Sequence, residues 1–354
     1  MAEHKTITYQ EAGVDIEAGD RLVDLIKPIV RKTYGPRVLG DLGGFAGMLQ
    51  LEGRLDLFRR GRRDPVLVAC TDSTGSKILL AKETGRYDTV GIDLVAMSVN
   101  DLITVGAEPL IFLDYVAVNQ LSPSQVAEII DGVANGCLKA GCSLVGGETA
   151  ELPDIYRPGE FDLVGFAVGI VERRRIIDGS EIEPGDAVIG LPSNGIHSNG
   201  YTLVRRLIFQ EAGLKHDSMV PEIGCSIGEE LLKPTNIYAK PVLNVLHKYR
   251  RKRMVRGMAH ITGGGLPGNV VRILPEGCAV TIDTNSWTIP PIFELLQSIG
   301  VERDEMFRVF NMGIGYVLIV HPQSENRIIR YFRRQGIDAL TIGRVRKGSG
   351  VEIK

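Results

Sequence analysis

The stretch Asn100-Asp101-Leu102-Ile103-Thr104-Val105-Gly106-Ala107-Glu108-Pro109 has the form Asp-x4-Gly-Ala-x-Pro. It closes a segment, residues 90–105, in which apolar side chains recur at helical spacing, so this segment is predicted to be a helix. Gly106 suits the C-terminal cap of that helix, and Pro109 cannot continue it.

Two acids stand on this apolar helix, Asp93 and Asp101, and their spacing places them on roughly one face. An acid on a largely buried helix is costly unless a cation or hydrogen bonds compensate it. The simpler interpretation of a lone acid on such a helix is exposure to solvent. Further acids in apolar surroundings favour a site.

Three more short segments combine glycines with acids. They are residues 71–77 after the apolar run 66–70, residues 146–151 after the run 143–145, and the glycine-rich stretch 41–47. Acids at strand ends beside glycine turns are where α/β folds place ligand sites. Carboxylates suit Mg²⁺, and glycine loops let backbone N–H groups approach phosphate. Neither of the common nucleotide-binding motifs, G-x-x-x-x-G-K-[ST] and G-x-G-x-x-G, is present. Each segment alone is weak evidence for a binding site, because most glycine turns have no ligand.

Two histidines lie beside similar turns. His197 precedes an expected helix that Ser198 or Asn199 would cap, and the free N–H groups at such a helix start form an anion site. His260 ends an apolar strand before the glycines of residues 263–265. The alternatives are a histidine that only helps to cap the helix and a polar residue at a strand end, and both stay open.

The rest of the chain alternates between predicted strands and helices. Strands are predicted at 66–70, 110–118, 162–171, 186–191, 278–282, 312–320 and 340–345, and helices at 19–34, 122–140, 199–212, 291–299 and 324–335. This alternation favours an α/β or α+β fold. Residues 172–186 are polar and charged, so we predict domains at 1–171 and 172–354.

Composition is typical of a globular cytoplasmic enzyme. The 354 residues are 44% hydrophobic with a net charge of −2, which provides no basic footprint for nucleic acid. Basic runs at 59–63, 173–175 and 250–253 are interpreted as solvated surface or linker. The five cysteines are odd in number and lack C-x-x-C spacing, which favours reduced thiols. We expect neither a signal peptide nor a membrane span, because the longest apolar run, 163–171, is far below the ~20 residues that a span needs.

Taken together and in order, these motifs resemble phosphoribosylformylglycinamidine cyclo-ligase, also called aminoimidazole ribonucleotide synthetase, of purine biosynthesis. The resemblance runs nearly end to end and includes residues 9–16, 43–44, 71–72, 91–97, 101–109, 146–151, 197–201, 260–265 and 310–315. The chain departs from the family pattern at Ser73-Thr74 and at Leu266-Pro267-Gly268. No carboxylate, lysine or histidine is lost there, so affinity and loop geometry are in question more than the reaction.

The resemblance implies a two-domain fold whose amino-terminal domains pair into a homodimer with a shared β-barrel. It implies that ATP phosphorylates the formamide oxygen of formylglycinamidine ribonucleotide. The amidine nitrogen then closes the ring to 5-aminoimidazole ribonucleotide, with release of ADP and phosphate. The protein positions the reactants and neutralises charge, as in other phosphoryl transfers.

The resemblance also implies site residues. ATP would contact Gly43, Gly44, Gly47, Asp72, Lys77, Asp93 and Asp101, and the substrate would contact Gly147, Glu148, Thr149, His197, Ser198 and Asn199. The ligands of Mg²⁺ would be Asp72, Asp101 and Glu148, and the catalytic residues would be Lys77, Asp101, His197 and His260. Lys77 would stabilise charge on the transferring phosphoryl group.

Other functions remain as alternatives. Selenophosphate synthetase and thiamine-phosphate kinase belong to the same superfamily, but the former usually carries a reactive cysteine near its amino-terminal glycine loop, and residues 1–69 contain none. Hydrogenase-maturation relatives end in a cysteine-bearing tail, which this chain lacks. A non-catalytic dimeric scaffold would predict lost carboxylates, yet Asp72, Asp101 and Glu148 are present.

Overall fold

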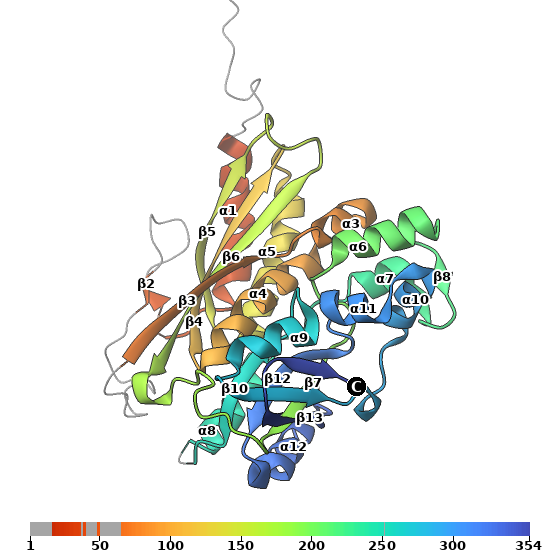
Figure 1. Ribbon diagram of the computed structural model, residues 1–354. Coiled ribbons are helices and arrows are strands. Elements are labelled where there is room, and N and C mark those ends of the chain that lie inside the picture. Colours follow the sequence, from red (N-terminus) through yellow and green to blue (C-terminus); the bar gives the residue numbers. More distant parts are fainter. Residues whose placement is uncertain (1–15, 37, 40–47, 50–64, 251) are drawn as a thin grey trace, which may run out of the picture.

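Two β-sheets with helices packed around them organise the chain (Figure 1). The computed structural model describes residues 16–36, 38–39, 48–49, 65–250 and 252–354. The first sheet has the order β3-β6-β4-β5, formed by β3 (Pro65–Ser73), β4 (Glu108–Val118), β5 (Ser143–Glu151) and β6 (Phe161–Glu172). The second has the order β10-β12-β7-β13-β11-β14, formed by β7 (Ala187–Pro192), β10 (Val255–His260), β11 (Cys278–Ile282), β12 (Ile314–Val320), β13 (Leu340–Lys347) and β14 (Val351–Ile353).

Shorter strands and the helices complete the description. Two-residue strands pair as β1 (Val38–Leu39) with β2 (Met48–Leu49) and β8 (Met219–Val220) with β9 (Cys225–Ser226). The helices are α1 (Ile16–Arg31), α3 (Lys77–Thr84), α4 (Asp88–Leu102), η1 (Ile103–Val105), α5 (Pro123–Ala140), η2 (Arg173–Arg175), α6 (Tyr201–Arg205), η3 (Arg206–Glu211), α7 (Ile227–Leu231), α8 (Ala239–Lys248), α9 (Gly265–Val270), η4 (Val271–Ile273), η5 (Thr284–Ser286), α10 (Pro291–Gly300), α11 (Arg303–Val309), η6 (Pro322–Ser324) and α12 (Glu325–Arg333).

Both sheets are mixed. In the first, β6 runs antiparallel to β3 and β4, whereas β4 and β5 are parallel. In the second, only β11 and β14 are parallel. Largely antiparallel sheets combined with many helices confirm the predicted α/β (α+β) fold class. Within the described residues, no helix is long and apolar enough to cross a membrane.

The helix predicted from the Asp-x4-Gly-Ala-x-Pro motif is confirmed. It consists of α4 and η1, and Gly106 ends it with a left-handed φ of 79°. The helix α4 is almost entirely buried, because α5 packs on it closely and the sheets flank it. A Cβ on Gly91 would lie 2.2 Å from the carbonyl oxygen of Ile129 in α5, so a side chain at Gly91 would force the two helices apart.

The predicted helix at 199–212 is wrong in its start and its continuity. It begins only at Tyr201, and a π-helical segment, η3, follows Arg205. The residue before the helix is Gly200, with φ 77°, so neither Ser198 nor Asn199 caps it. Instead, the Ser198 hydroxyl donates a hydrogen bond to the carbonyl of Thr74 at 3.0 Å, in the other half of the chain.

The predicted glycine turn at residues 146–147 is also wrong, because β5 continues through both glycines to Glu151. Gly147 lies opposite Asp114 of β4. A Cβ on Gly147 would come within 2.6 Å of an Asp114 carboxylate oxygen. Glycine is therefore required here for the close approach of a neighbouring side chain.

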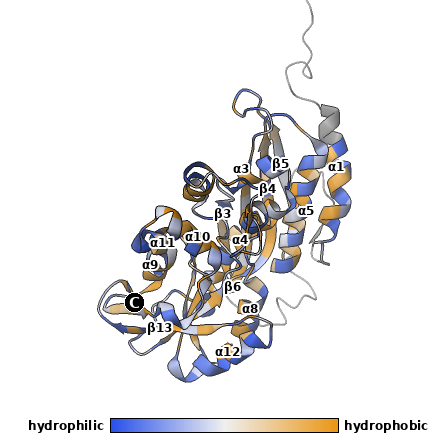
Figure 2. Ribbon diagram, turned by 90° about the vertical axis from the view of Figure 1, so that its right-hand side faces the viewer, coloured by the Kyte–Doolittle hydropathy of each residue, from blue (hydrophilic) through white to orange (hydrophobic). Residues whose placement is uncertain are grey.

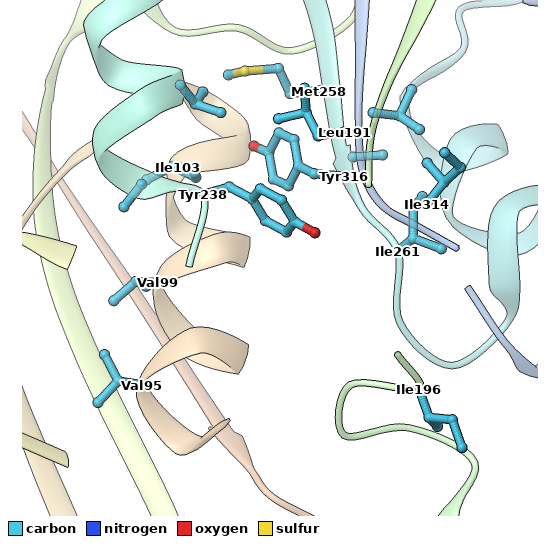
Figure 3. Close-up of a cluster of buried hydrophobic side chains, with 14 of the residues drawn as sticks. Val95, Val99, Ile103, Leu191, Ile196, Tyr238, Met258, Ile261, Ile314 and Tyr316 are labelled. Atoms are coloured by element: carbon cyan, nitrogen blue, oxygen red, sulfur yellow. The ribbon is translucent and has the colours of Figure 1, made fainter. Parts of the chain in front are cut away.

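One hydrophobic core joins the two halves. The same cluster contains Val95 and Val99 of α4 together with Tyr316 of β12 (Figure 3). The rings of Tyr238 and Tyr316 lie side by side, with centroids 5.4 Å apart. Figure 2 shows the exposed polar and inward apolar sides of the helices that surround this core. The interface between the halves is thus built like a protein interior.

Candidate functional site

The centre of the site is a contact between Asp101 and His260. The last turn of α4 presents Asp101, and the end of β10 presents His260 from the other half of the chain. The Nδ1 atom of His260 lies 2.8 Å from Oδ1 of Asp101. The histidine side chain is 1% exposed and the aspartate side chain 47%, so one partner of the pair faces solvent.

Hydrogen bonds indicate which tautomer the neutral ring of His260 adopts. Nε2 of His260 lies 3.5 Å from the amide nitrogen of Asn100, which can only donate. The orientation of that amide is fixed because its oxygen accepts from the backbone N–H of Tyr238 at 2.9 Å. When the ring is neutral, Nε2 therefore accepts, and Nδ1 carries the proton that it donates to Asp101.

A second carboxylate, Asp72, faces the same region from β3. Cys70, two residues earlier on the same face, donates its thiol to the Ser98 carbonyl of α4 at 3.0 Å. Burial raises the pKa of Asp72, and the charge of Asp101 raises it further, while His260 opposes the shift. Two carboxylates that repel each other are a fitting donor set for Mg²⁺, which takes one or two carboxylates plus substrate phosphates.

The structure does not bring Glu148 to these two acids. The Cα partners Asp72, Gly165, Asp114 and Gly147 form one row across the first sheet. Glu148 belongs to the next row, and successive side chains point to opposite faces. Glu148 is accordingly exposed on the face that α4 and α5 leave open. Within the described residues, no three acidic, histidine or cysteine side chains converge on a point that could hold a metal ion.

Lys77 and Asp93 form a buried ion pair. Nζ of Lys77 lies 2.7 Å from Oδ2 of Asp93, and both side chains have 0% exposure. The ammonium also donates to the carbonyls of His197 at 3.0 Å and Lys233 at 2.7 Å, so all three of its protons are used. Burial lowers the pKa of Lys77 and raises that of Asp93, and their mutual attraction opposes both shifts. Neither group is open to a bound triphosphate in this arrangement.

His197 is also enclosed. It is 2% exposed and has an unusual left-handed φ of 68°. Its Nε2 accepts from the backbone N–H of Asn236 at 3.5 Å, and its Nδ1 has no partner within the described part of the chain. Burial holds the pKa of His197 well below the ordinary value, with the charges of His260 and Lys77 adding to the shift. His197 is therefore a neutral interior side chain.

Three loops converge beside these residues: the loop after β3, the turn before α6 and the glycine turn before α9. The Ser76 and Thr202 hydroxyls lie 3.1 Å apart, which joins the loop after β3 to the start of α6. A Cβ on Gly263 would lie 3.8 Å from the amide oxygen of Asn199. At one departure from the family pattern, Thr74 is fully buried, and its hydroxyl has no partner in the described structure.

Residues 234–238 of the second half bond to helix α4 of the first half, and the sequence did not predict this contact. Asp93 accepts from the backbone N–H and the hydroxyl of Thr235 at 2.7 and 2.6 Å. Asn100 donates to the carbonyl of Asn236 at 2.8 Å. Asn100 carried a usable signal, since it is a further polar residue on the apolar helix that carries Asp93 and Asp101.

Comparisons with known proteins identify the family of this chain. The family models of AIR synthase related protein, N-terminal domain and C-terminal domain, match residues 56–171 and 183–354. Phosphoribosylformylglycinamidine cyclo-ligase of Syntrophotalea carbinolica is 51% identical over 99% of this chain and 97% of its own. That of a Geobacillus species is 51% identical over 97% of this chain and 96% of its own. The chain belongs to the phosphoribosylformylglycinamidine cyclo-ligase family.

Solved structures of distant relatives show how widely this cyclo-ligase fold is shared. Thiamine-monophosphate kinase from Stenotrophomonas maltophilia covers 94% of this chain and 96% of its own, with a TM-score of 0.65 at 18% identity. Hydrogenase maturation protein HypE in complex with ATP covers 97% and 90%, with a TM-score of 0.62 at 17% identity. At such identities the likeness confirms the two-domain fold alone.

Some residues predicted for the cyclo-ligase site have no structural test. Gly43, Gly44 and Gly47 lie outside the described residues, as do the basic run 59–63 and the motif at 9–15. Gly147, Glu148 and Thr149 lie on β5. The roles assigned to these residues stay predictions.

A buried acid that was not predicted, Asp114, lies on β4 between glycines of the two neighbouring strands. Burial raises its pKa from 3.8 to about 7. The folded protein thus keeps a proton on Asp114 up to about pH 7, whereas the unfolded chain releases it near pH 4. Wild-type stability should therefore fall as pH rises across this window.

Asp114→Asn should remove this dependence. Its free energy of unfolding should rise relative to wild type between about pH 4 and pH 7, by at most about 4 kcal/mol. Denaturant unfolding at a series of pH values measures the difference, with the exposed Asp154→Asn as the control. A pH-independent difference would mean that Asp114 is ionised in the folded state.

Proposed function

We propose that this chain catalyses the ATP-dependent ring closure of formylglycinamidine ribonucleotide to 5-aminoimidazole ribonucleotide, in purine biosynthesis. The observation that carries the proposal is the Asp101–His260 pair beside Asp72, at the junction of the two halves, in a chain 51% identical to cyclo-ligases over nearly its full length.

The proposed reaction has two steps. ATP transfers its γ-phosphoryl group to the formamide oxygen, and ADP leaves. The amidine nitrogen then attacks the same carbon, the nitrogen–carbon bond closes the ring, a proton is lost, and the former amide oxygen leaves with the phosphate. An amide oxygen is a poor leaving group, so phosphorylation makes ring closure feasible. The protein contributes positioning and charge neutralisation.

Each carboxylate and loop has a place in this proposal. Asp72 and Asp101 would hold Mg²⁺, which neutralises phosphate charge when bound. The loop with Gly43, Gly44 and Gly47 would line the triphosphate, and the three loops beside Asn199 would hold the ribonucleotide. Gly147, Glu148 and Thr149 would contribute to substrate binding from the open face of the sheet.

Buried residues take a different role from the one that the sequence indicates. Since Lys77 uses all its donors within the protein, we propose that Lys77 and Asp93 position the 197–199 and 233–235 segments. They would act without touching ATP. His260 would keep Asp101 oriented.

The proposal is tested by measuring ADP release from ATP with and without formylglycinamidine ribonucleotide. ADP and 5-aminoimidazole ribonucleotide should form in equal amounts, and only when the substrate is present. Equal ADP release without substrate, or phosphoryl transfer to thiamine phosphate or selenide, would contradict it.

His197→Ala should raise the KM for the ribonucleotide more than the KM for ATP, with kcat nearly intact. The reason is that the 197–199 turn lies beside the Gly263 loop, and removal of the ring loosens this turn. Steady-state kinetics with each substrate varied separately measure the effect. A fall in kcat at normal KM would instead assign His197 to proton transfer. Unchanged kinetics in a less stable protein would leave it a purely structural role.

The open face of the first sheet supports a homodimer. Leu67 and Phe166 are 62% and 40% exposed, and Ile111, Leu113 and Tyr115 lie half-buried on the same face. Exposed apolar surface of this kind marks an interaction site. We propose that a second copy covers it, with the two sheets forming the barrel that the family resemblance implies.

Phe166→Glu combined with Leu67→Glu should convert the dimer to a monomer, because the substitutions bury four carboxylates in a two-fold interface. Light scattering coupled to size exclusion measures the mass. Ile155→Glu is the matched control, since Ile155 is 70% exposed but lies in the loop between β5 and β6 and on neither strand. A wild-type monomer, or a dimer that survives the double substitution, would refute this interface.

Two further predictions accompany this function. We propose a domain division at 1–171 and 172–354, since the first sheet ends at Glu172 and the second begins at Ala187. A cytoplasmic location is also part of the proposal, because the metabolites of this reaction are polar and phosphorylated.

A further inference from the structure

A cavity of about 590 Å³ is lined in part by the linker that follows β6 (residues 172–186), and neither Asp101 nor His260 lines it. Its walls come from the linker, from α8 and the residues after it, and from β10, which lie together at the lower part of Figure 1. Arginines that the sequence keeps far apart, on either side of β7, meet around this cavity. Six arginines line it (Arg173, Arg174, Arg175, Arg250, Arg253 and Arg256), against three acids (Glu172, Asp178 and Glu181).

Several of these arginines are neutralised by the protein. Arg253 pairs with Glu181, and Arg256 pairs with Asp186 at 2.9 Å. In contrast, Arg175 and Arg250 have no hydrogen-bond or ion-pair partner within the described residues. Arg175 is half-buried, and its charge has no compensating anion among the described residues. The cavity thus holds uncompensated positive charge.

The remaining wall of the cavity is apolar. Leu243 and Leu246 of α8 line it together with Tyr249 and Met254. Guanidinium groups match the oxygens of phosphate with paired hydrogen bonds, and apolar or aromatic side chains favour a flat organic group. An inorganic anion would use only the charged part of this cavity.

We propose that this cavity binds a small phosphate ester with an aromatic part, such as a nucleoside monophosphate. Its phosphate lies between Arg175 and Arg250, and its ring lies against Tyr249 and the leucines of α8. This site is separate from the proposed catalytic site and does not depend on the proposed reaction.

The position of the cavity connects it to the catalytic helix. It reaches Gly106, the residue that ends the helical segment carrying Asp101. The linker is fixed there, because Ile177 donates its backbone N–H to the carbonyl of Val105 at 3.2 Å. A ligand in the cavity therefore contacts the linker at the point where it holds this segment.

The test is a calorimetric titration of the full chain with AMP, in wild type and three variants. Arg175→Ala combined with Arg250→Ala should weaken AMP binding at least tenfold, which corresponds to about 1.4 kcal/mol. Arg334→Ala, an exposed arginine after α12, is the control and should stay within twofold of wild type. Asp101→Asn should leave the affinity unchanged, because it alters only the catalytic site.

Pyrophosphate is the second probe and should bind more weakly than AMP, since it lacks the ring. The proposal is overturned if wild type binds no AMP at millimolar concentration, or if the double variant binds as tightly as wild type. It is equally overturned if Asp101→Asn abolishes the binding, or if pyrophosphate binds as tightly as AMP. Substrate-dependent ADP release by the double variant shows that the catalytic site stays intact.

Discussion

Lys77→Met is expected to lower the free energy of unfolding by about 3–5 kcal/mol, the cost of breaking a buried ion pair from one side. The substitution leaves the Asp93 carboxyl group at 0% exposure without its cation, and it leaves the carbonyls of His197 and Lys233 without their donor. Denaturant unfolding monitored by circular dichroism measures the change. Activity per folded molecule should fall as well, because the 197–199 turn loses its anchor.

Two further variants make this result specific. Lys82→Met on the same helix is the matched control, since Lys82 is 34% exposed and lies 3.9 Å from Glu160. It should cost less than about 1 kcal/mol. Adding Asp93→Asn to Lys77→Met should restore much of the lost stability, because the amide oxygen still accepts from Thr235 while the buried charge is gone. A double variant less stable than Lys77→Met alone would show that the charge on Asp93 does not cause the loss.

Asp101→Asn is expected to lower kcat on the order of a hundredfold or more, the scale on which a single preorganised charge-stabilising group acts. Asparagine keeps the shape and can still accept the proton on Nδ1 of His260, so the loss reports on charge. The free energy of unfolding should change little, since the Asp101 side chain is 47% exposed. Single-turnover and steady-state kinetics at saturating Mg²⁺ measure the effect.

His260→Ala in both backgrounds tests whether the pair acts as a unit. If His260 acts by orienting Asp101, the double variant should be scarcely slower than Asp101→Asn alone. Asp131→Asn on α5, where the aspartate side chain is 41% exposed, is the charge control and should keep wild-type kcat. Independent, multiplicative losses would assign His260 a role of its own, and normal activity in Asp101→Asn would make that carboxylate structural.

The sequence predicted the long elements because their periodicity and ends are local properties. The helix around Asp101 and its end at Gly106 follow from spacing and a glycine, and both are confirmed. Short helices such as α9 escaped prediction. Its six residues include two glycines and a proline, and the side chain of Asn269 holds its first turn by donating to the carbonyl of Gly265 at 2.8 Å.

The site was predicted in part, and its gaps have a common cause. Asp72, Asp101 and His260 lie in the same region. Each stands at or near the end of a helix or strand, and this position could be predicted from the sequence. The partner of Lys77 could not be identified, because Asp93 lies on another helix and an accessible lysine has the same sequence signature as a buried one. The direction in which Glu148 points depends on the register of β5 against β4, which shifts between Phe112 and Leu113.

The Lys77 ammonium has a consequence for how ligands enter and leave. It joins α3 and α4 to the carbonyls of His197 and Lys233 in the other half, and it lies in a continuous core. A hinge motion that separates the halves would have to expose this ion pair and the rings of Tyr238 and Tyr316. We therefore expect the two halves to move as one rigid body, so that substrates enter and products escape through rearrangement of surface loops alone.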